Sequence, residues 1–370
     1  MPNLTAAAVA KILTRRERFC RVYDGLPVDR PVRWECVAFW SETLAEWKAA
    51  GTLPADVDAM AYFGQEPRPT ISAGLGLTSM DLSGPPVTAR VVEEAADSRV
   101  VEDSLGSLRR ERTDGCSMPQ FLRFPVESHA DWLNKIKPRL DPAAHDYGNW
   151  EADARASHTG EDPWGLWLVG LYAFWRNYWG EEKLAYAFYD TPETLHDMAR
   201  TWLHMHAACL PRVLAASRFD WVLFHEDMAF KNGPLIGPHL FIEFMAPYYR
   251  ELLDLLRGHG LRRLAVDSDG HNGLVLDRFI DLGINGLFPF EVAAGYDIRE
   301  VRKRYPGFCI WGGIDKRVLT GTRDDIRREV LEKVPAVWAS GPFIPSLDHS
   351  CPPCPQANFE YFLELVRGLF

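Results

Sequence analysis

The chain has 370 residues, of which 47% are hydrophobic and 25% charged, a composition typical of a soluble globular protein. Its formal net charge is −10, and no run of Lys or Arg is long enough to form a nucleic-acid-binding stripe, which argues against a nucleic-acid partner. No apolar run reaches the length needed to span a bilayer, so no membrane partner is expected.

The N-terminal stretch, residues 1–19, has an apolar run that is broken by Lys11 and followed by charged residues, unlike a secretion signal. It is predicted to form a first amphipathic helix. Seven cysteines, scattered from Cys20 to Cys354, are an odd number and lack the pattern of a disulfide framework. A reducing, cytoplasmic compartment is therefore the expected location.

The first third of the chain shows weaker periodicity. A predicted strand at 32–38 and a helix at 41–50, capped by Ser41, follow the first helix. Residues 52–125 contain many Pro, Gly and short β-like pieces, and they are interpreted as an irregular insertion built of β-hairpins. A short helical piece at 131–137 then leads into a loop-rich stretch.

From residue 167 onward, apolar strands and amphipathic helices alternate regularly. Strands are predicted at 167–172, 221–224, 261–267, 286–290, 308–311 and 343–347. Helices are predicted at 181–190, 192–217, 238–259, 273–282, 298–305, 322–339 and 359–369. At least five consecutive strand–helix units require a parallel sheet covered by helices.

Polar side chains follow nearly every one of these strands. They are Glu226 and Asp227, Asp267 and Asp269, Glu291, Asp315, and Asp348 and His349. A closed barrel gathers all strand ends at one mouth, whereas an open sheet gathers them only near its switch point. The predicted fold is therefore α/β, a (β/α)8 TIM-type barrel in which residues 1–370 form one domain with an N-terminal helix and the hairpin-rich insertion.

The most informative stretch is 261–272, LRRLAVDSDGHN, in which an apolar strand runs into Asp267, Asp269, His271 and Asn272. Residues two apart in a strand point to the same side, so the two carboxylates would project together. On this stretch alone, an Asp-rich turn that caps the next helix is the simpler interpretation. The recurrence of acids after the other strands favours a metal site or a proton-transfer site.

Acids gathered this densely would repel one another, so they would need basic partners, raised pKa values or a divalent cation. Lys231 and Lys316 are the nearest basic candidates in the loops. Near the C-terminus, His349 and Cys351 belong to a His-x-Cys-x-x-Cys motif, whose imidazole and thiolate suit zinc. The alternative is a rigid Pro-containing turn with two half-buried thiols.

Three segments, GPHLFIEFMAPYYRELLDLL (237–256), CIWGGIDKRVLTGT (309–322) and SLDHSCPPCPQANFEYF (346–362), resemble signature segments of the uroporphyrinogen decarboxylase superfamily of barrels. The resemblance puts His349 at the family histidine and loosely matches Asp81 to the catalytic aspartate. The decarboxylases carry substrate-binding arginines near their start, where this sequence has Cys36 and Trp40.

The segments WECVAFWSETLAEW (34–47) and DSDGHN (267–272) resemble the corrinoid-dependent methyltransferases of the same superfamily. Those enzymes bind zinc through His and Cys, and the matching positions here are Asp267, Asp269 and His349. The resemblance implies a methyltransferase that demethylates a small O-, N- or S-methyl substrate onto a corrinoid held by a partner protein. Zinc as a second cofactor and a homodimer are family-level expectations.

Site residues are assigned on this basis. The expected catalytic residues are Asp269, Glu226, His349 and Asp267. The expected substrate-binding residues are His225, Asp227, Lys231, His271, Asn272, Glu291, Trp34 and Lys316. The expected metal ligands are Asp267, Asp269, His349 and Cys351, unless the site is metal-free and Asp and His do acid–base work. The alternative functions are a decarboxylase of a porphyrinogen or a smaller acid, and a tetrapyrrole-binding protein without turnover.

Overall fold

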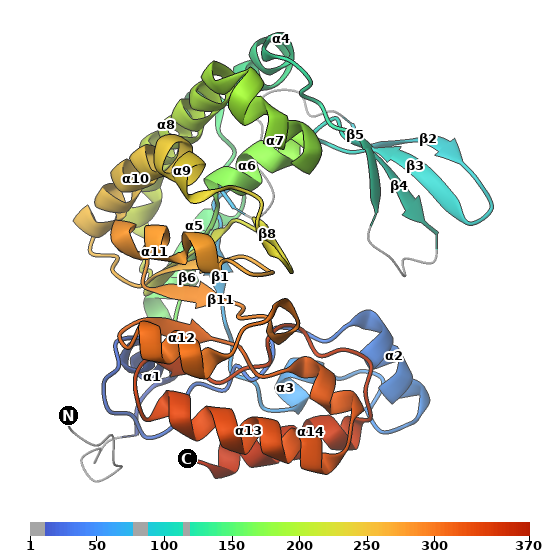
Figure 1. Ribbon diagram of the computed structural model, residues 1–370, viewed down its shortest axis with the longest axis vertical. Helices are drawn as coiled ribbons and strands as arrows, with labels where there is room; N and C mark the ends of the chain where they lie inside the picture. Colours follow the sequence, from blue (N-terminus) through green and yellow to red (C-terminus); the bar gives the residue numbers. More distant parts are fainter. Residues whose placement is uncertain (1–11, 77–87, 114–118) are drawn as a thin grey trace.

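The computed structural model describes residues 12–76, 88–113 and 119–370, so that Asp81 lies outside the described residues. Figure 1 shows a body of strands and helices from which a small antiparallel sheet stands out on one side. Within the described ranges, no helix combines the length and the apolar character that a membrane crossing requires.

The centre of the body is a sheet of seven strands, and every neighbouring pair runs parallel. In sheet order, the strands are β1 (Thr70–Ile71), β6 (Gly165–Val169), β7 (Trp221–His225), β10 (Leu264–Asp267), β11 (Gly286–Phe288), β12 (Cys309–Trp311) and β13 (Phe343–Ile344). Helices join consecutive strands from β6 onward, because a parallel connection must cross back over the sheet. The predicted α/β alternation is confirmed.

An extended segment, residues 33–39, lies between the two edges of this sheet and joins them. On one side, the Glu66 amide, just before β1, donates to the Arg33 carbonyl over 2.9 Å. On the other side, the Leu347 amide, just after β13, donates to the Glu35 carbonyl over 2.8 Å. These bonds complete the ring of the TIM-type barrel, although the strand predicted at this place is an extended segment without a regular ladder.

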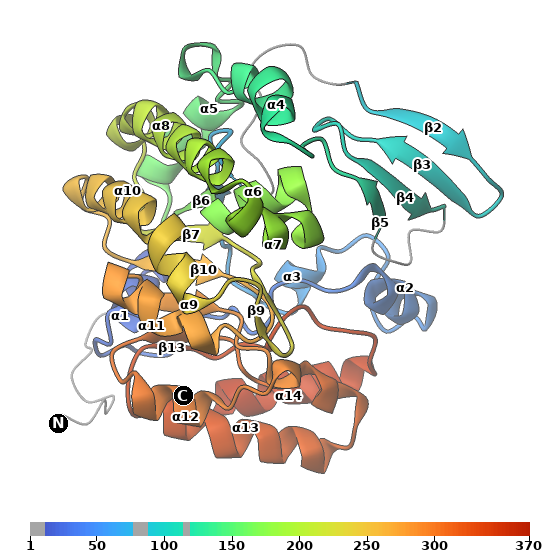
Figure 2. The ribbon, with the colours of Figure 1, turned by 45° about the horizontal axis from the view of Figure 1, so that its top comes forward.

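Helices cover the outside of the barrel, and Figure 2 shows α8, α10 and α11 side by side along it. The helices are α1 (Arg15–Tyr23), α2 (Ser41–Ala49), α3 (Ala59–Tyr62), α4 (His129–Asp131), α5 (Trp150–Thr159), α6 (Leu171–Trp179), α7 (Glu181–Asp190), α8 (Pro192–Ala216), α9 (Pro238–Leu240), α10 (Ala246–Gly258), α11 (Gly273–Leu282), α12 (Ile298–Arg304), α13 (Arg323–Trp338) and α14 (Gln356–Gly368). Short 3-10 and π-helical turns occur between them, including η2 (Trp132–Ile136) and η5 (Phe241–Met245).

Two further predicted elements differ clearly from the structure. The strand predicted at 167–172 ends at Val169, and α6 begins at Leu171 because the Glu226 carboxylate accepts the first amide groups of that helix. The single helix predicted at 238–259 consists of α9, the π-helical turn η5 and α10.

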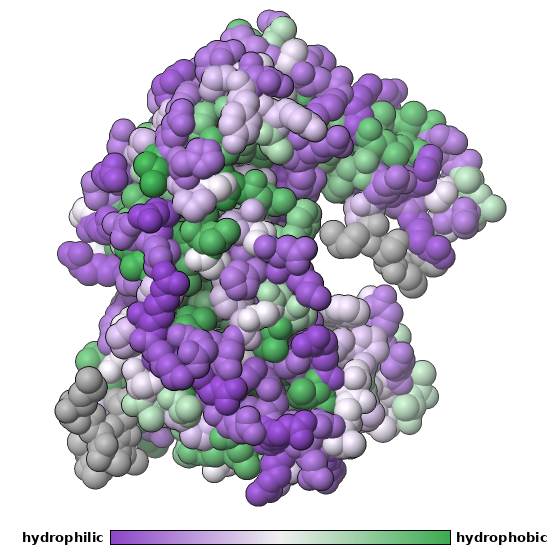
Figure 3. All heavy atoms as spheres, viewed as in Figure 1, coloured by the Kyte–Doolittle hydropathy of each residue, from purple (hydrophilic) through white to green (hydrophobic). Residues whose placement is uncertain are grey.

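The hairpin-rich stretch forms a separate four-stranded antiparallel sheet, called the arm from here on. Its strands are β2 (Arg90–Glu94), β3 (Ser98–Glu102), β4 (Leu108–Arg112) and β5 (Gln120–Arg123). Because β1 belongs to the barrel, the part that stands apart is shorter than the expected insertion at 52–125. Figure 3 shows the molecule hollowed between the arm and the body.

The interior of the barrel is filled by aromatic side chains. Trp34, Trp221 and Trp311 lie together, with ring centroids 5.1–6.2 Å apart, and each is at most 3% exposed. Gly165 makes room for them, since a Cβ at this position would lie 2.5 Å from the Trp221 ring. These three rings, called the aromatic floor from here on, include Trp34, which was predicted to bind substrate directly and instead lies in the core of the barrel.

Candidate active site

The carboxyl ends of the strands open into a cavity of about 540 Å³, called the mouth cavity from here on. The arm reaches it through Phe121 and Phe124, and the loop after β7 contributes Phe230. Five residues that were predicted from the sequence also line it: His225, Asp227, Lys231, Asp269 and Glu291. The convergence of strand ends on one mouth therefore brings together side chains from β7, β10 and β11 and the loops that follow them.

His225 and Asp267 are the last residues of the neighbouring strands β7 and β10, and they are paired in register. His225 Nδ1 lies 3.1 Å from Asp267 Oδ2. Burial by itself lowers the pKa of His225, but the hydrogen bond to Asp267 and the charges of Asp267 and Asp227 outweigh it, so the pKa is raised. The pair thus favours a protonated imidazole at the mouth cavity.

Asp269, in the loop after β10, faces His349, in the loop after β13. His349 Nε2 lies 3.8 Å from Asp269 Oδ1. Burial raises the pKa of Asp269 to about 6, the charges of neighbouring acids act in the same direction, and the charge of His349 opposes them. The raised pKa makes Asp269 a candidate proton donor of the mouth cavity.

Glu291, Lys316 and Asp348 form a linked group beside this pair. Lys316 Nζ lies 3.2 Å from Glu291 Oε1 and 3.8 Å from Asp348 Oδ1. The other oxygen of Glu291 accepts a hydrogen bond from the Gly270 amide over 3.0 Å. Glu291 thereby holds the loop that carries Asp269, and Lys316 supplies positive charge among the gathered acids.

Asp227 is held by Arg176 of α6, a residue that the sequence analysis did not single out. Arg176 Nη1 donates to Asp227 Oδ2 over 2.7 Å and to the Asp227 carbonyl over 2.6 Å. Asp227 has a φ of 42°, a left-handed conformation that is uncommon outside glycine, and these bonds stabilise it. The signal in the sequence is an Arg-Asn pair inside the otherwise aromatic run 171–179.

Glu226, predicted to be catalytic, does not reach the mouth cavity. It is 0% exposed, and its carboxylate accepts the amide N–H groups of Leu171, Tyr172 and Ala173 over 2.8–3.1 Å. The Tyr249 hydroxyl donates to the same carboxylate. Glu226 therefore anchors the N-terminus of α6, where a carboxylate satisfies amide groups that have no partner within the helix.

Asn272 and His271, predicted to bind substrate, instead shape the loop after β10. Asn272 is fully buried, and its Nδ2 donates to the Ser268 carbonyl over 2.9 Å. The ring of His271 stacks on Tyr296 with centroids 4.5 Å apart and does not line the mouth cavity. Asn272 thereby fixes the backbone that presents Asp269.

The predicted metal ligands do not form a common site. Among the described residues, no group of three or more His, Cys, Asp or Glu side chains is arranged to hold a metal ion. Cys351 is fully buried, and the contact of its Sγ with Cys354 Sγ at 3.7 Å, together with burial, raises the pKa of its thiol. A thiolate is therefore disfavoured there, and a zinc site of the His-and-Cys type does not fit these residues.

The Cys351→Ala variant is accordingly expected to keep the metal content and turnover of the wild-type protein, because this thiol faces the apolar core. Elemental analysis of chelator-free preparations measures the metal content, and methyl transfer to cob(I)alamin measures the turnover. Cys209→Ala, which removes another fully buried thiol, is the matched control. A loss of bound zinc in the Cys351 variant alone would contradict this assignment.

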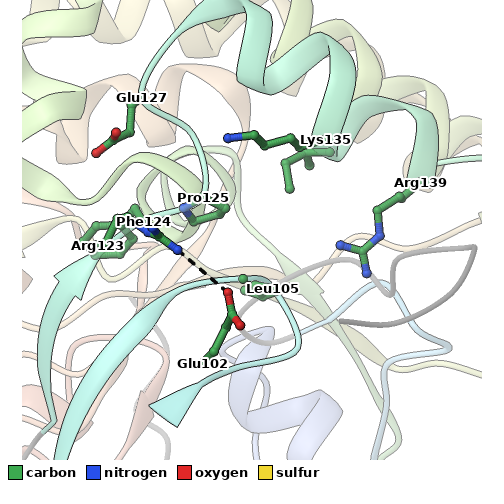
Figure 4. A pocket seen from close by; sticks show the side chains of 10 residues that line it. Glu102, Leu105, Arg123, Phe124, Pro125, Glu127, Lys135 and Arg139 are labelled. Atoms are coloured by element: carbon green, nitrogen blue, oxygen red, sulfur yellow. Dashed lines mark ion pairs between the residues drawn. The ribbon is translucent and has the colours of Figure 1, made fainter. Parts of the chain in front are cut away.

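A second cavity, of about 410 Å³, lies where the arm meets η2 (Figure 4). Two of its charged side chains form an ion pair, since Arg123 lies 3.8 Å from Glu102, and a third, Lys135, lies 2.5 Å from Asp131. None of the strands of the barrel contributes a residue to its lining. The mouth cavity is therefore the better candidate for an active site.

Comparisons with known proteins agree with this architecture. Residues 180–369, more than half of the chain, match the family model described as uroporphyrinogen decarboxylase (URO-D). The chain is 26% identical over 197 residues to the chloroplastic uroporphyrinogen decarboxylase of Nicotiana tabacum, covering 52% of this chain and 47% of that protein. It is 28% identical over 122 residues to the uroporphyrinogen decarboxylase of a Synechococcus species, covering 33% and 34%.

These matches span about half or less of the length of each curated relative. A solved structure of a methyltransferase from Methanosarcina mazei superposes with a TM-score of 0.53 and 13% sequence identity, covering 96% of this chain and 99% of that one. At this identity the likeness concerns the fold, and it extends over nearly the whole chain.

Proposed function

Because the chain belongs to the uroporphyrinogen decarboxylase family, we propose that it is an enzyme that removes a methyl group from the oxygen, nitrogen or sulfur of a small substrate. The acceptor in this proposal is a corrinoid carried by a partner protein. The observation that supports it most strongly is Asp269, an acid with a pKa of about 6 that faces His349 at the mouth cavity. The fold shared with the methyltransferase from Methanosarcina mazei is consistent with it.

The chemical requirement is activation of a poor leaving group. When the bond between the methyl carbon and the heteroatom breaks, its electron pair goes to the heteroatom, and a proton from Asp269 neutralises the charge that forms there. His349 then stabilises the Asp269 carboxylate. His225, whose pKa is raised by its bond to Asp267, would add positive charge in the same cavity when it is protonated.

The corrinoid, when bound, supplies the nucleophile that accepts the methyl group. The rim of the mouth cavity fits the broad apolar face of such a ring, because Phe121 and Phe230 line it and are 45% and 60% exposed. Exposed aromatic side chains of this kind are typical of binding surfaces. Phe121 and Phe230 would thus hold the partner's cofactor at the rim, and the substrate would bind in the mouth cavity.

A second candidate is a decarboxylase that acts on a carboxylic acid. The family and the names of the curated relatives favour it. In that reaction, the bond between carbon and the carboxyl group breaks, carbon dioxide leaves, and Asp269 would protonate the carbon. The positions of the family's substrate-binding arginines are taken here by Cys36, which is fully buried, and Trp40, which lies on the surface. Neither side chain can neutralise a carboxylate. This disfavours a porphyrinogen with eight carboxylates as the substrate.

The test mixes the purified protein with cob(I)alamin and a panel of O-, N- and S-methyl compounds. We expect a protein-dependent loss of cob(I)alamin absorbance and a demethylated product detected by mass spectrometry. Parallel reactions with uroporphyrinogen test for decarboxylase activity, whose products would be porphyrinogens with fewer carboxyl groups. No methyl transfer across the panel would contradict the proposal, and tetrapyrrole affinity without either product would identify a binding protein.

A further inference from the structure

One arginine, Arg68, packs against the aromatic floor. Arg68 lies two residues before β1, and its guanidinium lies over the rings of Trp34 and Trp311, with Cζ 5.6 Å and 5.4 Å from their centroids. Its Nη2 donates to the Val37 carbonyl over 2.8 Å. The residue is only half-buried, so part of its surface is accessible to solvent despite its position in the interior.

This guanidinium has no carboxylate partner among the described residues, which is unusual for a cation in a protein interior. Burial lowers the pKa of Arg68, and the charge of Asp267 acts in the opposite direction. The fork of N–H groups is therefore available for an acceptor that the described part of the chain does not supply.

The surroundings of Arg68 contain further unpartnered donors. The indole Nε1 groups of Trp34, Trp221, Trp311 and Trp167 donate to no acceptor within the described ranges, although all four are buried. An indole N–H can only donate, and buried donors are usually paired. This part of the interior thus has an excess of donors, which matches a group that only accepts hydrogen bonds, such as a carboxylate.

Aromatic rings connect Arg68 with the candidate acid. The ring of Trp311 lies 5.0 Å from that of Phe288, and the ring of Phe288 lies 6.3 Å from that of His349. His349 in turn faces Asp269. Contacts between aromatic rings thus link the Arg68 site to the proton donor.

We propose that Arg68 binds a carboxylate of the substrate, so that the methyl donor is an organic acid with an aromatic or other apolar part. One positive charge with an acid, Asp267, close enough to act on it favours a monoanion over a dianion such as a phosphate monoester, which Asp267 would repel more strongly. This inference rests on the proposed function for the identity of the methyl donor, but binding alone tests it.

The test titrates the full chain with benzoate, benzamide and phenyl phosphate and follows tryptophan fluorescence, because two tryptophans contact Arg68. We expect benzoate to bind wild-type protein about 10–100-fold more tightly than neutral benzamide, the range for a hydrogen bond to a charged group. Phenyl phosphate should bind more weakly than benzoate. This comparison needs no variant and so does not depend on how a substitution folds.

Arg68→Gln should remove most of the preference for benzoate over benzamide, and Arg68→Lys, which keeps the charge but loses the planar fork, should retain part of it. Arg317→Gln is the matched control, since Arg317 is 58% exposed and pairs with Asp315 outside the mouth cavity. Equal affinity for benzoate and benzamide, an Arg68→Gln variant that binds benzoate like wild type, or no benzoate binding up to its solubility limit would each overturn the inference.

Failure of this inference is distinguishable from failure of the proposed function. Arg68-dependent benzoate binding without any methyl transfer would leave the carboxylate site standing and refute the methyltransferase. Methyl transfer from uncharged donors, with no preference for acids and no effect of Arg68→Gln on KM, would support the methyltransferase and refute the carboxylate site.

Discussion

Replacing Asp269 with asparagine is expected to lower the turnover rate by about 10²–10⁴-fold, the contribution typical of a positioned general acid. Asparagine has the shape of aspartate but cannot give up a proton at neutral pH. The side chain of Asp269 lies in a loop at the mouth cavity and is 43% exposed, so the fold should be unaffected. The rate comes from the cob(I)alamin assay, and circular dichroism checks the fold.

The pH dependence gives a second readout of the same residue. Because burial and neighbouring charges raise the pKa of Asp269 to about 6, its protonated fraction falls about tenfold per pH unit above that value. If Asp269 donates the proton, the wild-type rate falls as pH rises through this range, and the residual rate of Asp269→Asn lacks this limb.

Asp254→Asn is the matched control, since Asp254 is 67% exposed on α10 and outside the mouth cavity. It should behave like wild type. A wild-type rate that rises as the pH passes through 6 would indicate that the reaction needs a general base, not a general acid. An Asp269→Asn variant with an undiminished rate would show that Asp269 takes no part in the reaction.

Replacing Glu226 with alanine is expected to lower the free energy of unfolding by about 3–5 kcal/mol, at the upper end of single substitutions. The change leaves the first amide groups of α6 and the Tyr249 hydroxyl without their acceptor in a site that is 0% exposed. Each buried donor that loses its acceptor costs about 1–3 kcal/mol, and local relaxation recovers part of this. Chemical denaturation followed by circular dichroism measures the effect.

Two comparisons make this prediction specific. Tyr249→Phe removes only one donor and should cost about 1–3 kcal/mol. Glu251→Ala, an exposed position on the same helix α10, should stay within about 0.5 kcal/mol of wild type. A Glu226→Ala variant that is as stable as wild type but has lost turnover would show that Glu226 is a catalytic residue and not a structural anchor.

The regular half of the fold was predictable because its signals are local. The helices α7 and α11 have the bounds predicted from periodicity and flanking residues, and the barrel strands β7, β10, β11, β12 and β13 lie within a few residues of their predicted places. The presence of acids after successive strands was equally visible, and a barrel requires such positions to share one mouth. Asp269 and His349, far apart in the chain, accordingly face each other.

The role of each acid at the strand ends depended on contacts that no local pattern contains. Glu226 and Asp227 are adjacent in sequence, yet α6 packs over the first and the second lines the mouth cavity. Cys351 follows His349 by two residues, but its sulfur packs in the apolar core. The burial of a side chain is decided by what packs against it from elsewhere in the chain.

By itself, the amino-acid sequence determined the alternation of strands and helices, the barrel class and the set of polar residues available to its mouth, since these follow from periodicity and backbone geometry. Only the tertiary structure decided which of those residues meet and which are sealed in the core. Arg68 is the clearest case, because it lies in a stretch without periodicity and enters the barrel only through the pairing of β1 with the distant β6. Its chemistry depends on neighbours such as Trp311, which long-range packing alone brings within reach.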